Sequence, residues 1–539
     1  MNREIPGFYY DSAKHRYFRI EKSQTAPARA EWSAQNVKRR AAEQAEEEER
    51  RARLRRDARR VTRARVAAVP LMGGLLAREA GMSPWGGGGG AGDEPVARAW
   101  AAGLAEKGEV RLWPSAGGTV SAMWVGCCGG GEDDGLGVVC AAADGLWPSS
   151  SFIPRDADDR INFQFAAERY PRLSFMPRAL LGTLPFRGRV AAIKCHESSS
   201  RILLACEFHQ GHVGIWHFPL RDPETGATSL LQQLLRGDID GVEPRMSALV
   251  GGSAFAIHAL QPAPPSSRLT CIAGTDRGIA QLHGDVLTLL APPPRQNQQQ
   301  QHPRRERRRR PQRPPDPDPD LAPWQGDVLA VDFPHPNPAD TVLAGTRSGR
   351  VCLLDLRAPP REWSAGSGSA ALRHPGSAAH VRSVGAHHVL VAGPRDAMAL
   401  YDVRFLRQRQ QQQQQQPQQR ECGGAGAGWN DNATLPLFAF PAYRNAAHLR
   451  VGLDVLTEAG YGGSGSGIVA AAHAADGDGG GTVALYSLRD GARVAAAAVD
   501  GVRAPGVVQA LQWRTLPGDR HPSLFVAEGL VVKKYSFWA

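Results

Sequence analysis

The chain has 539 residues, of which 42% are hydrophobic, so it can bury a large core and is not expected to be disordered throughout. Its 60 Gly and 40 Pro residues exceed what helical proteins carry and favour short strands separated by turns. The net charge of +11 comes from Arg, because only 7 of the 64 basic residues are Lys. Together with the long Ala and Gly runs, this skew indicates a compositional bias, so the charge is weak evidence for nucleic-acid binding.

The start of the chain and its cysteines argue against a secreted, membrane-spanning or disulfide-bonded protein. The opening MNREIPGFYYDSAKHRYF lacks the apolar stretch of a signal peptide, and no run of about 18 apolar residues predicts a membrane span. The 8 Cys residues form no C-x-x-C pair, which disfavours zinc sites and disulfide frameworks. The sequence has no phosphate-loop, zinc-protease or serine-hydrolase motif. We therefore expect a nuclear or cytoplasmic protein that is not an enzyme and uses no cofactor or metal.

The N-terminal region divides into three segments. Residues 1–30 carry two aromatic-rich runs, at 7–11 and 16–20, around a polar turn, which predicts a β-hairpin. Residues 31–67 are rich in Ala, Arg and Glu with Glu–Arg pairs four residues apart, which predicts a charged helix, either solvated or bound to a partner. Residues 68–105 contain a Gly-rich stretch and are expected to form a linker.

The hairpin allows two interpretations. Its aromatic side chains either pack on the wall of the main domain or form a partner-binding surface, as aromatic hairpins do with proline-rich peptides. The residues concerned are Phe8, Tyr9, Tyr10, Tyr17 and Phe18.

A strand–turn–strand pattern repeats over the remainder of the chain. Three copies read CIAGTDRGIAQLH (271–283), VLAGTRSGRVCLLDLR (342–357) and VLVAGPRDAMALYDVR (389–404). A period of about 40–50 residues of paired strands predicts a β-propeller. Seven units follow, at about 118–145, 186–220, 246–285, 324–357, 379–406, 446–494 and 507–537. We therefore expect an all-β fold over residues 106–539, in which the strand 108–114 completes the last blade and closes the ring.

Two low-complexity segments interrupt these units. Residues 291–320 are rich in Pro, Gln and Arg, and residues 407–428 carry a Gln tract. Both are expected to be disordered insertions between strands. The basic cluster at 304–313 is either a solvated loop or a nuclear-import or RNA-contact patch.

Two motifs in consecutive units carry a resemblance to a known family. LLDLR (353–357) and LYDVR (400–404) resemble the Trp-Asp signature of WD-repeat propellers in its Asp-x-Arg form. More specifically, three stretches look like the family of damage-binding-protein-and-cullin-4-associated factors. These are the opening PGFYYDSAKHRYFRI, the blade GTRSGRVCLLDLR, and the tail from LYSLRDGARV to GLVVKKYSF. The resemblance covers the N-terminal motif and roughly the last 215 residues.

The resemblance implies a fold, a function and a site. The fold is a seven-bladed WD-repeat β-propeller, and the function is that of a substrate receptor of a cullin-4 RING ubiquitin ligase. The implied partners are the adaptor, damage-specific DNA-binding protein 1, and a substrate protein that the sequence does not name. The implied adaptor-binding residues are Asp355, Arg357, Asp402 and Arg404.

The geometry of these motifs can be anticipated from strand alternation. Residues i and i+2 of a strand share a face, so each Asp would lie beside its Arg and orient the guanidinium. Both arginines would then emerge on one face of the disc, where they suit carboxylate or carbonyl groups of a partner. Alternatively, each Arg pairs within its own blade and never touches a partner.

The motifs also depart from the WD-repeat pattern. Leu354 and Tyr401 stand where the family has Trp, and Ser348 stands where it usually has Asp. We therefore expect these blades to lack part of the Ser/Thr-His-Asp-Trp hydrogen-bond network. Two other functions stay open: a WD-repeat scaffold in RNA processing or ribosome assembly, favoured by the charge and the Arg-rich insertion, and a structural hub of another complex.

Overall fold

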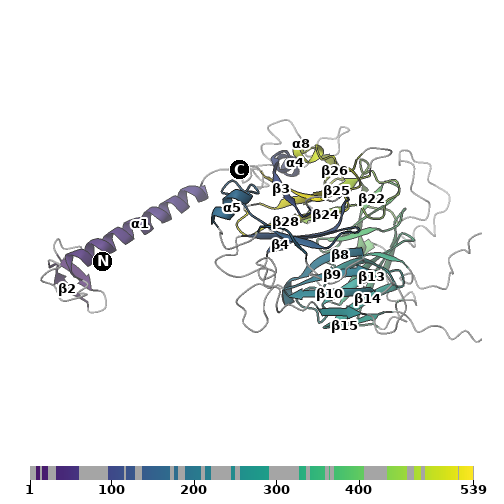
Figure 1. The fold of residues 1–539 in the computed structure, drawn as a ribbon, viewed down its shortest axis with the longest axis horizontal. Coiled ribbons are helices and arrows are strands. Elements are labelled where there is room, and N and C mark those ends of the chain that lie inside the picture. The colour runs from purple at the N-terminus through teal and green to yellow at the C-terminus, as the bar shows by residue number, and fades with distance from the viewer. Residues whose placement is uncertain are drawn as a thin grey trace, which may run out of the picture. The chain divides into compact units, whose positions relative to one another are not determined.

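The computed structural model forms two compact units, Met1–Met72 and Gly73–Ala539, which we describe one at a time (Figure 1). The insertions expected at 291–320 and 407–428, the basic cluster at 304–313 and residues 68–94 of the expected linker lie outside the described residues. The structure describes residues 8–11, 15–21, 32–59, 95–113, 117–127, 136–169, 175–179, 189–207, 213–219, 245–248, 255–290, 327–334, 340–358, 363, 370–405, 434–457, 467–474, 480–519 and 521–537.

The first unit consists of a hairpin and a helix. Strands β1 (Phe8–Asp11) and β2 (Arg16–Arg19) pair antiparallel. Helix α1 (Ala34–Arg59) begins where the Ser33 hydroxyl accepts the backbone N–H of Asn36 at 3.3 Å, which is an N-cap. One of the expected Glu–Arg pairs forms on its surface, between Glu47 and Arg51 at 2.6 Å.

The second unit is a ring of seven four-stranded antiparallel sheets, which confirms the prediction of a seven-bladed β-propeller. We number the blades in chain order. Blade one contains β4 (Val120–Cys127), β5 (Gly137–Ala143), β6 (Ser149–Ile153) and β7 (Arg178–Ala179). Blade two contains β8 (Arg189–His196), β9 (Arg201–Glu207), β10 (Val213–Pro219) and β11 (Arg245–Ala248). Blade three contains β12 (Ile257–Pro262), β13 (Cys271–Thr275), β14 (Gly278–His283) and β15 (Val286–Leu289).

The remaining blades follow the same order of strands. Blade four contains β16 (Val328–Asp332), β17 (Thr341–Thr346), β18 (Arg350–Asp355) and β19 (Ala370–Arg373). Blade five contains β20 (His380–Val384), β21 (His388–Gly393), β22 (Ala397–Asp402) and β23 (Phe438–Ala439). Blade six contains β24 (Leu453–Thr457), β25 (Gly467–His473), β26 (Thr482–Ser487) and β27 (Arg493–Val494). Blade seven contains β28 (Leu511–Arg514), β29 (Ser523–Glu528), β30 (Val531–Phe537) and β3 (Leu104–Arg111).

Short helices complete the second unit. They are α4 (Pro95–Ala102), α5 (Phe163–Arg169), η1 (Glu197–Ser199), η3 (Val403–Phe405) and α8 (Ala497–Asp500). No helix of the described part of the chain combines the length and apolar character needed to cross a membrane.

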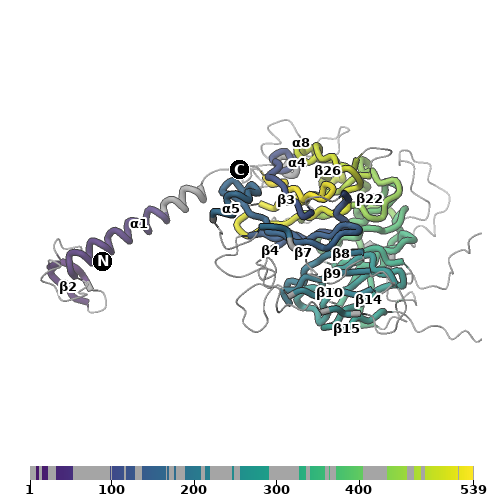
Figure 2. Tube along the Cα trace, viewed as in Figure 1, coloured from purple at the N-terminus to yellow at the C-terminus, as the bar shows by residue number. Residues whose placement is uncertain are grey.

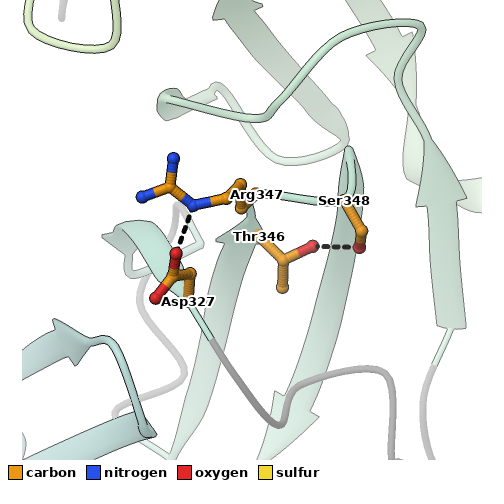
Figure 3. A pocket seen from close by; sticks show the side chains of 4 residues that line it. All are labelled: Asp327, Thr346, Arg347 and Ser348. Carbon is orange, nitrogen blue, oxygen red and sulfur yellow. Dashed lines mark hydrogen bonds and ion pairs between the residues drawn. The ribbon is translucent and has the colours of Figure 1, made fainter. Parts of the chain in front are cut away.

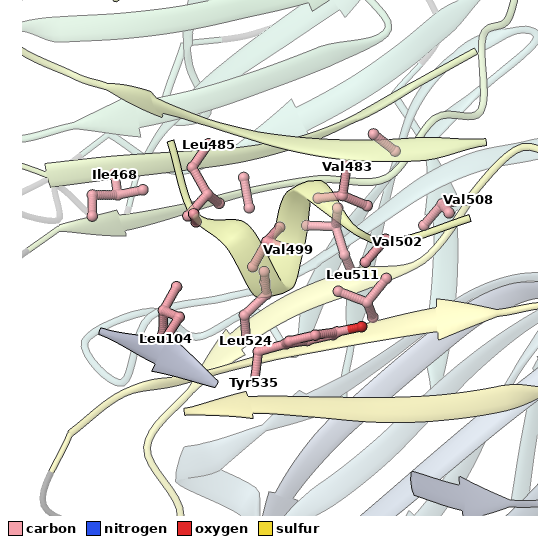
Figure 4. Close-up of a cluster of buried hydrophobic side chains, with 14 of the residues drawn as sticks. Leu104, Ile468, Val483, Leu485, Val499, Val502, Val508, Leu511, Leu524 and Tyr535 are labelled. Carbon is pink, nitrogen blue, oxygen red and sulfur yellow. The ribbon is translucent and has the colours of Figure 1, made fainter. Parts of the chain in front are cut away.

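The second strand of each blade is buried on both faces because neighbouring blades pack against each other face to face. Every residue of β5 (GVVCAAA) and β25 (GIVAAAH) is buried. Small side chains in these strands let adjacent sheets approach closely, so the Ala runs that look like compositional bias lie in the packed core. One cluster, between blades six and seven, joins Leu104 of β3, Val499 of α8 and Tyr535 of β30 (Figure 4).

The ring closes through a strand that precedes blade one. β3 pairs antiparallel with β30, from Leu104 opposite Phe537 to Arg111 opposite Val531, and so lies beside the C-terminal strand (Figure 2). The predicted closing strand is therefore present, but it spans 104–111 instead of 108–114. The expectation of a linker over 68–105 is wrong for its last part, because α4 occupies Pro95–Ala102 and β3 begins at Leu104.

A buried ionic network links blade seven to the segment that follows β6 of blade one. Lys534 of β30 has no exposed surface, and its Nζ contacts Asp159 Oδ1 and lies 3.5 Å from Asp519 Oδ1. Arg155 pairs with Asp519 as well. Burial lowers the pKa of Lys534 to about 8, although Asp159 opposes that shift. Charged side chains therefore join blade seven to the segment after β6, in addition to the pairing of β3 with β30.

Candidate protein-interaction site

The two Asp-x-Arg motifs occupy the same place in consecutive blades. Asp355 is the last residue of β18 and lies opposite Thr341, the first residue of β17. Asp402 is the last residue of β22 and lies opposite His388, the first residue of β21. Because the blades repeat around one axis, both motifs lie on the same face of the disc, at the turn after the third strand, which we call the third-strand rim.

Each Asp holds its Arg in a side-on pair. Arg357 donates from Nε to Asp355 Oδ1 at 3.0 Å and from Nη2 to Oδ2 at 2.7 Å. Arg404 donates to Asp402 in the same way, at 3.1 and 2.7 Å. Two parallel charge-assisted bonds fix the plane of each guanidinium.

The expected reason for this pairing is wrong. The arginines do not share a strand face with the aspartates, because each strand ends at the Asp and the Arg lies in the following turn. In that turn Asp355 Oδ1 also accepts the backbone N–H of Arg357 at 3.0 Å, and Asp402 Oδ1 accepts that of Arg404 at 2.9 Å. The carboxylate therefore shapes the turn and orients the guanidinium at once.

The guanidinium groups of both pairs remain at the surface. Side-chain exposure is 71% for Arg357 and 51% for Arg404, whereas Asp402 is 6% exposed. The hydrogen bonds from the arginines lower the pKa of both carboxyls, Asp355 and Asp402, below their ordinary value. A guanidinium has five N–H donors, and Asp355 engages two of those on Arg357, so the pair still presents donors to solvent.

A buried indole supports the Asp355 turn, and a buried Tyr–His hydrogen bond lies within blade five, next to Asp402 in the sequence. Trp363, almost fully buried, donates its indole N–H to the backbone carbonyl of Asp355 at 2.8 Å. In blade five, the Tyr401 hydroxyl lies 2.9 Å from Nδ1 of buried His374, whose Nε2 lies 3.3 Å from the carbonyl of Ala397. A carbonyl only accepts, so Nε2 carries the proton and Tyr401 donates to Nδ1.

Blade five lacks the signature Trp, as expected, and a different hydrogen bond takes its place. Tyr401 stands in the position of the signature Trp and makes a hydrogen bond to a histidine through its hydroxyl. Sequence reasoning missed His374 because it precedes the blade by a loop and carries no motif of its own. The only usable signal was that a Tyr, unlike a Phe, needs a buried hydrogen-bond partner.

The hairpin aromatics are supported by their own unit. Phe18 stacks on Trp32 with ring centroids 4.7 Å apart, and Arg40 of α1 donates to the Tyr9 hydroxyl at 2.5 Å. Tyr10 contacts Tyr17 on the other face of the two-stranded sheet, with ring centroids 4.8 Å apart. On that face Phe8 is 45% exposed and Tyr17 39%. The residues predicted as a possible partner-binding surface thus divide between a packed face and an exposed one.

The opposite face of the disc carries the turns between second and third strands. A pocket of about 340 Å³ lies there in blade four, lined by Asp327, Thr346, Arg347 and Ser348 (Figure 3). Arg347 pairs with Asp327, and the Thr346 and Ser348 hydroxyls lie 2.9 Å apart. The charges in the pocket are therefore satisfied internally. In the described ranges, no three His, Cys, Asp or Glu side chains gather into a possible metal site.

Comparisons with known proteins show no family for this chain. No protein-family model matches the chain, and no curated protein matches it. Among solved structures, the WD40 β-propeller domain of Doa1 is similar at 11% identity and a TM-score of 0.45, covering 81% of this chain and 97% of that one. The seven sheets of the chain itself define a seven-bladed β-propeller. The third-strand rim, where the two Asp-x-Arg turns repeat, is its candidate protein-interaction site.

Proposed function

We propose that the protein is a non-catalytic substrate receptor of a cullin-4 RING ubiquitin ligase. It docks on the adaptor, damage-specific DNA-binding protein 1, through the Asp355–Arg357 and Asp402–Arg404 pairs. The observation that carries the proposal is that both motifs adopt the same turn, in consecutive blades, with guanidiniums held side-on by their own carboxylates. The resemblance of LLDLR and LYDVR to the adaptor-docking motif supports the choice of partner.

Within each pair, the geometry gives the aspartate and the arginine different roles. Asp355 and Asp402 hold the arginine side chains in place before docking. Binding therefore costs less side-chain conformational entropy. Arg357 and Arg404 offer planar donors to carboxylate or carbonyl groups, and these bonds strengthen when docking excludes water. With the adaptor on the third-strand rim, the opposite face stays accessible for a substrate. Holding a substrate lysine near the loaded conjugating enzyme raises its effective concentration, so the receptor needs no chemistry of its own.

The test is the double substitution Arg357→Ala, Arg404→Ala, with affinity for the purified adaptor measured beside a melting curve. Losing a charged partner that docking has desolvated costs about 2–5 kcal/mol each, so affinity should fall by roughly a thousandfold or more. The melting temperature should not change, because both side chains are mainly exposed. Substituting Asp355 or Asp402 is a poorer test, since these carboxylates hold the turns.

The matched control is Arg395→Ala, an exposed arginine in the turn between β21 and β22, at the opposite end of that hairpin from Asp402. It should bind the adaptor like the unchanged protein. A double variant that melts normally and still binds the adaptor would overturn the receptor function. The scaffold in RNA processing would then be favoured, and its RNA binding should weaken steeply as salt rises.

A further inference from the structure

A third turn on the third-strand rim repeats the geometry of the two Asp-x-Arg motifs. The segment Ser487–Leu488–Arg489 ends β26 of blade six, which follows blades four and five in the ring. Ser487 is the last residue of its third strand, as Asp355 and Asp402 are of theirs. It pairs with Ile468 near the start of the second strand β25.

The backbone hydrogen bonds establish that the three turns are equivalent. The middle residue of each motif donates its N–H to a carbonyl at the start of the second strand of its blade. Leu356 donates to Asp340 at 2.6 Å, Val403 to His387 at 2.9 Å and Leu488 to Gly467 at 3.0 Å. In each turn the first residue's side-chain oxygen accepts the N–H of the Arg, and for Arg489 the acceptor is Ser487 Oγ at 3.1 Å.

One chemical difference separates the third turn from the other two. Ser487 supplies the hydrogen bond that shapes the turn but has no charge to neutralise Arg489. Arg489 is exposed, and among the described residues no carboxylate oxygen lies within 4.0 Å of its guanidinium. The neighbouring Asp490 turns its Oδ1 to the N–H of Ala492 at 2.9 Å, and its Oδ2 has no hydrogen-bond partner among the described residues. In the described part of the chain, this turn therefore presents an arginine without a side-on carboxylate, whereas the other two present Asp–Arg pairs.

We propose that Arg489 is a third docking residue of the same interface, and that it binds a carboxylate of the partner. The interface then extends over an arc of three consecutive blades, with two guanidiniums held by their own aspartates and a third that makes no side-on pair within the described residues. This inference rests on the proposed function, since it assigns the same partner. A charged acidic group is the expected counterpart because, of the three arginines as described, only Arg489 has no carboxylate bound to its guanidinium.

The experiment measures the affinity of two variants, Arg489→Ala and Arg489→Glu, for the purified adaptor. The controls are Arg395→Ala and the double variant Arg357→Ala, Arg404→Ala. Arg489→Ala should weaken binding about threefold to tenfold, and Arg489→Glu by roughly tenfold or more, because it places like charges together. The loss caused by Arg489→Ala should shrink at high salt, since an exposed charge is screened. Arg395→Ala should leave affinity unchanged.

The outcomes distinguish this inference from the function on which it rests. If the unchanged protein does not bind the adaptor, both are overturned. If it binds and the double variant loses affinity while both Arg489 variants bind normally, only the third docking residue is wrong. A loss for Arg489→Ala that is accompanied by a lower melting temperature, or that does not depend on salt, also counts against a direct contact.

Discussion

Two buried histidines, His374 among them, make the stability of the fold depend on pH. His374 is buried and accepts from Tyr401, and burial lowers its pKa to about 4. Burial also lowers the pKa of His473, which contacts Tyr486 at 2.6 Å, to about 4. An unfolded histidine titrates near 6.5. Between pH 6.5 and 4 the unfolded chain therefore binds protons that the folded chain does not, and stability falls as the pH falls.

We predict that the free energy of unfolding decreases from pH 7 to pH 5. The expected loss is about 2 kcal/mol for each of these two histidines, measured by denaturant unfolding at both values. The variant His374→Gln should be less stable at pH 7 but should lose part of this pH dependence. Equal unfolding free energies at pH 7 and pH 5 would show that the two imidazoles take up protons without disturbing the fold.

Sequence reasoning reached part of the site at this scale. The Asp–Arg pairing could be predicted because both partners lie within three residues of each other. The support from Trp363 could not, because this residue reaches the Asp355 turn from a separate loop. Neither could the bond between His374 and Tyr401, which lie 27 residues apart. The Asp-x-Arg pattern does not predict Arg489, because a serine hydroxyl makes this turn as well as a carboxylate does.

At the scale of elements, β3 determines whether the ring is complete. It covers the edge of β30 and contributes Leu104 and Val110 to the buried core, and Leu112 follows directly behind it. Its middle, Glu106–Glu109, is polar and contains a bulge, with Gly108 at φ +105°. Period-two patterning is lost there, which is why its predicted start was four residues late. The Lys534–Asp159 contact was equally unpredictable, because 375 residues separate its partners.

We predict that a chain beginning at residue 117 is less soluble and melts at a lower temperature than the full chain. It exposes the edge of β30 and removes three buried leucine and valine side chains, of which each typically contributes about 2–5 kcal/mol. Removal of residues 1–30 is the control and should not change the melting temperature of the propeller. A fragment 117–539 as soluble and stable as the full chain would contradict the role of β3.

At the scale of the whole molecule, the repeat could be predicted because each blade carries the same apolar run, tight turn and second run. All seven units were found although the two expected insertions interrupt them. The flanks of the first insertion are tied to neighbouring strands. Leu290 donates to the carbonyl of Ile279 at 2.8 Å, and Arg347 donates to that of Asp327 at 2.9 Å.

Deletion of residues 292–320 should therefore leave the melting temperature and adaptor affinity unchanged. Seven residues, 291 and 321–326, would then join the two strands, and they can span up to about 24 Å. The free energy of folding depends only weakly on the length of such a loop. Differential scanning calorimetry and the adaptor-binding measurement check this. A fall of more than a few degrees would mean that the segment contributes to the folded core.

The pairing of β3 with β30 has a consequence for biosynthesis. On the ribosome β3 emerges early, but its partner begins only at Val531, 420 residues after Arg111. At about 5–20 residues per second, the strand waits roughly 20 to 80 seconds with both edges unpaired. During that interval the nascent chain offers an open edge to other chains, so blade seven is the last to form and depends most on protection by chaperones.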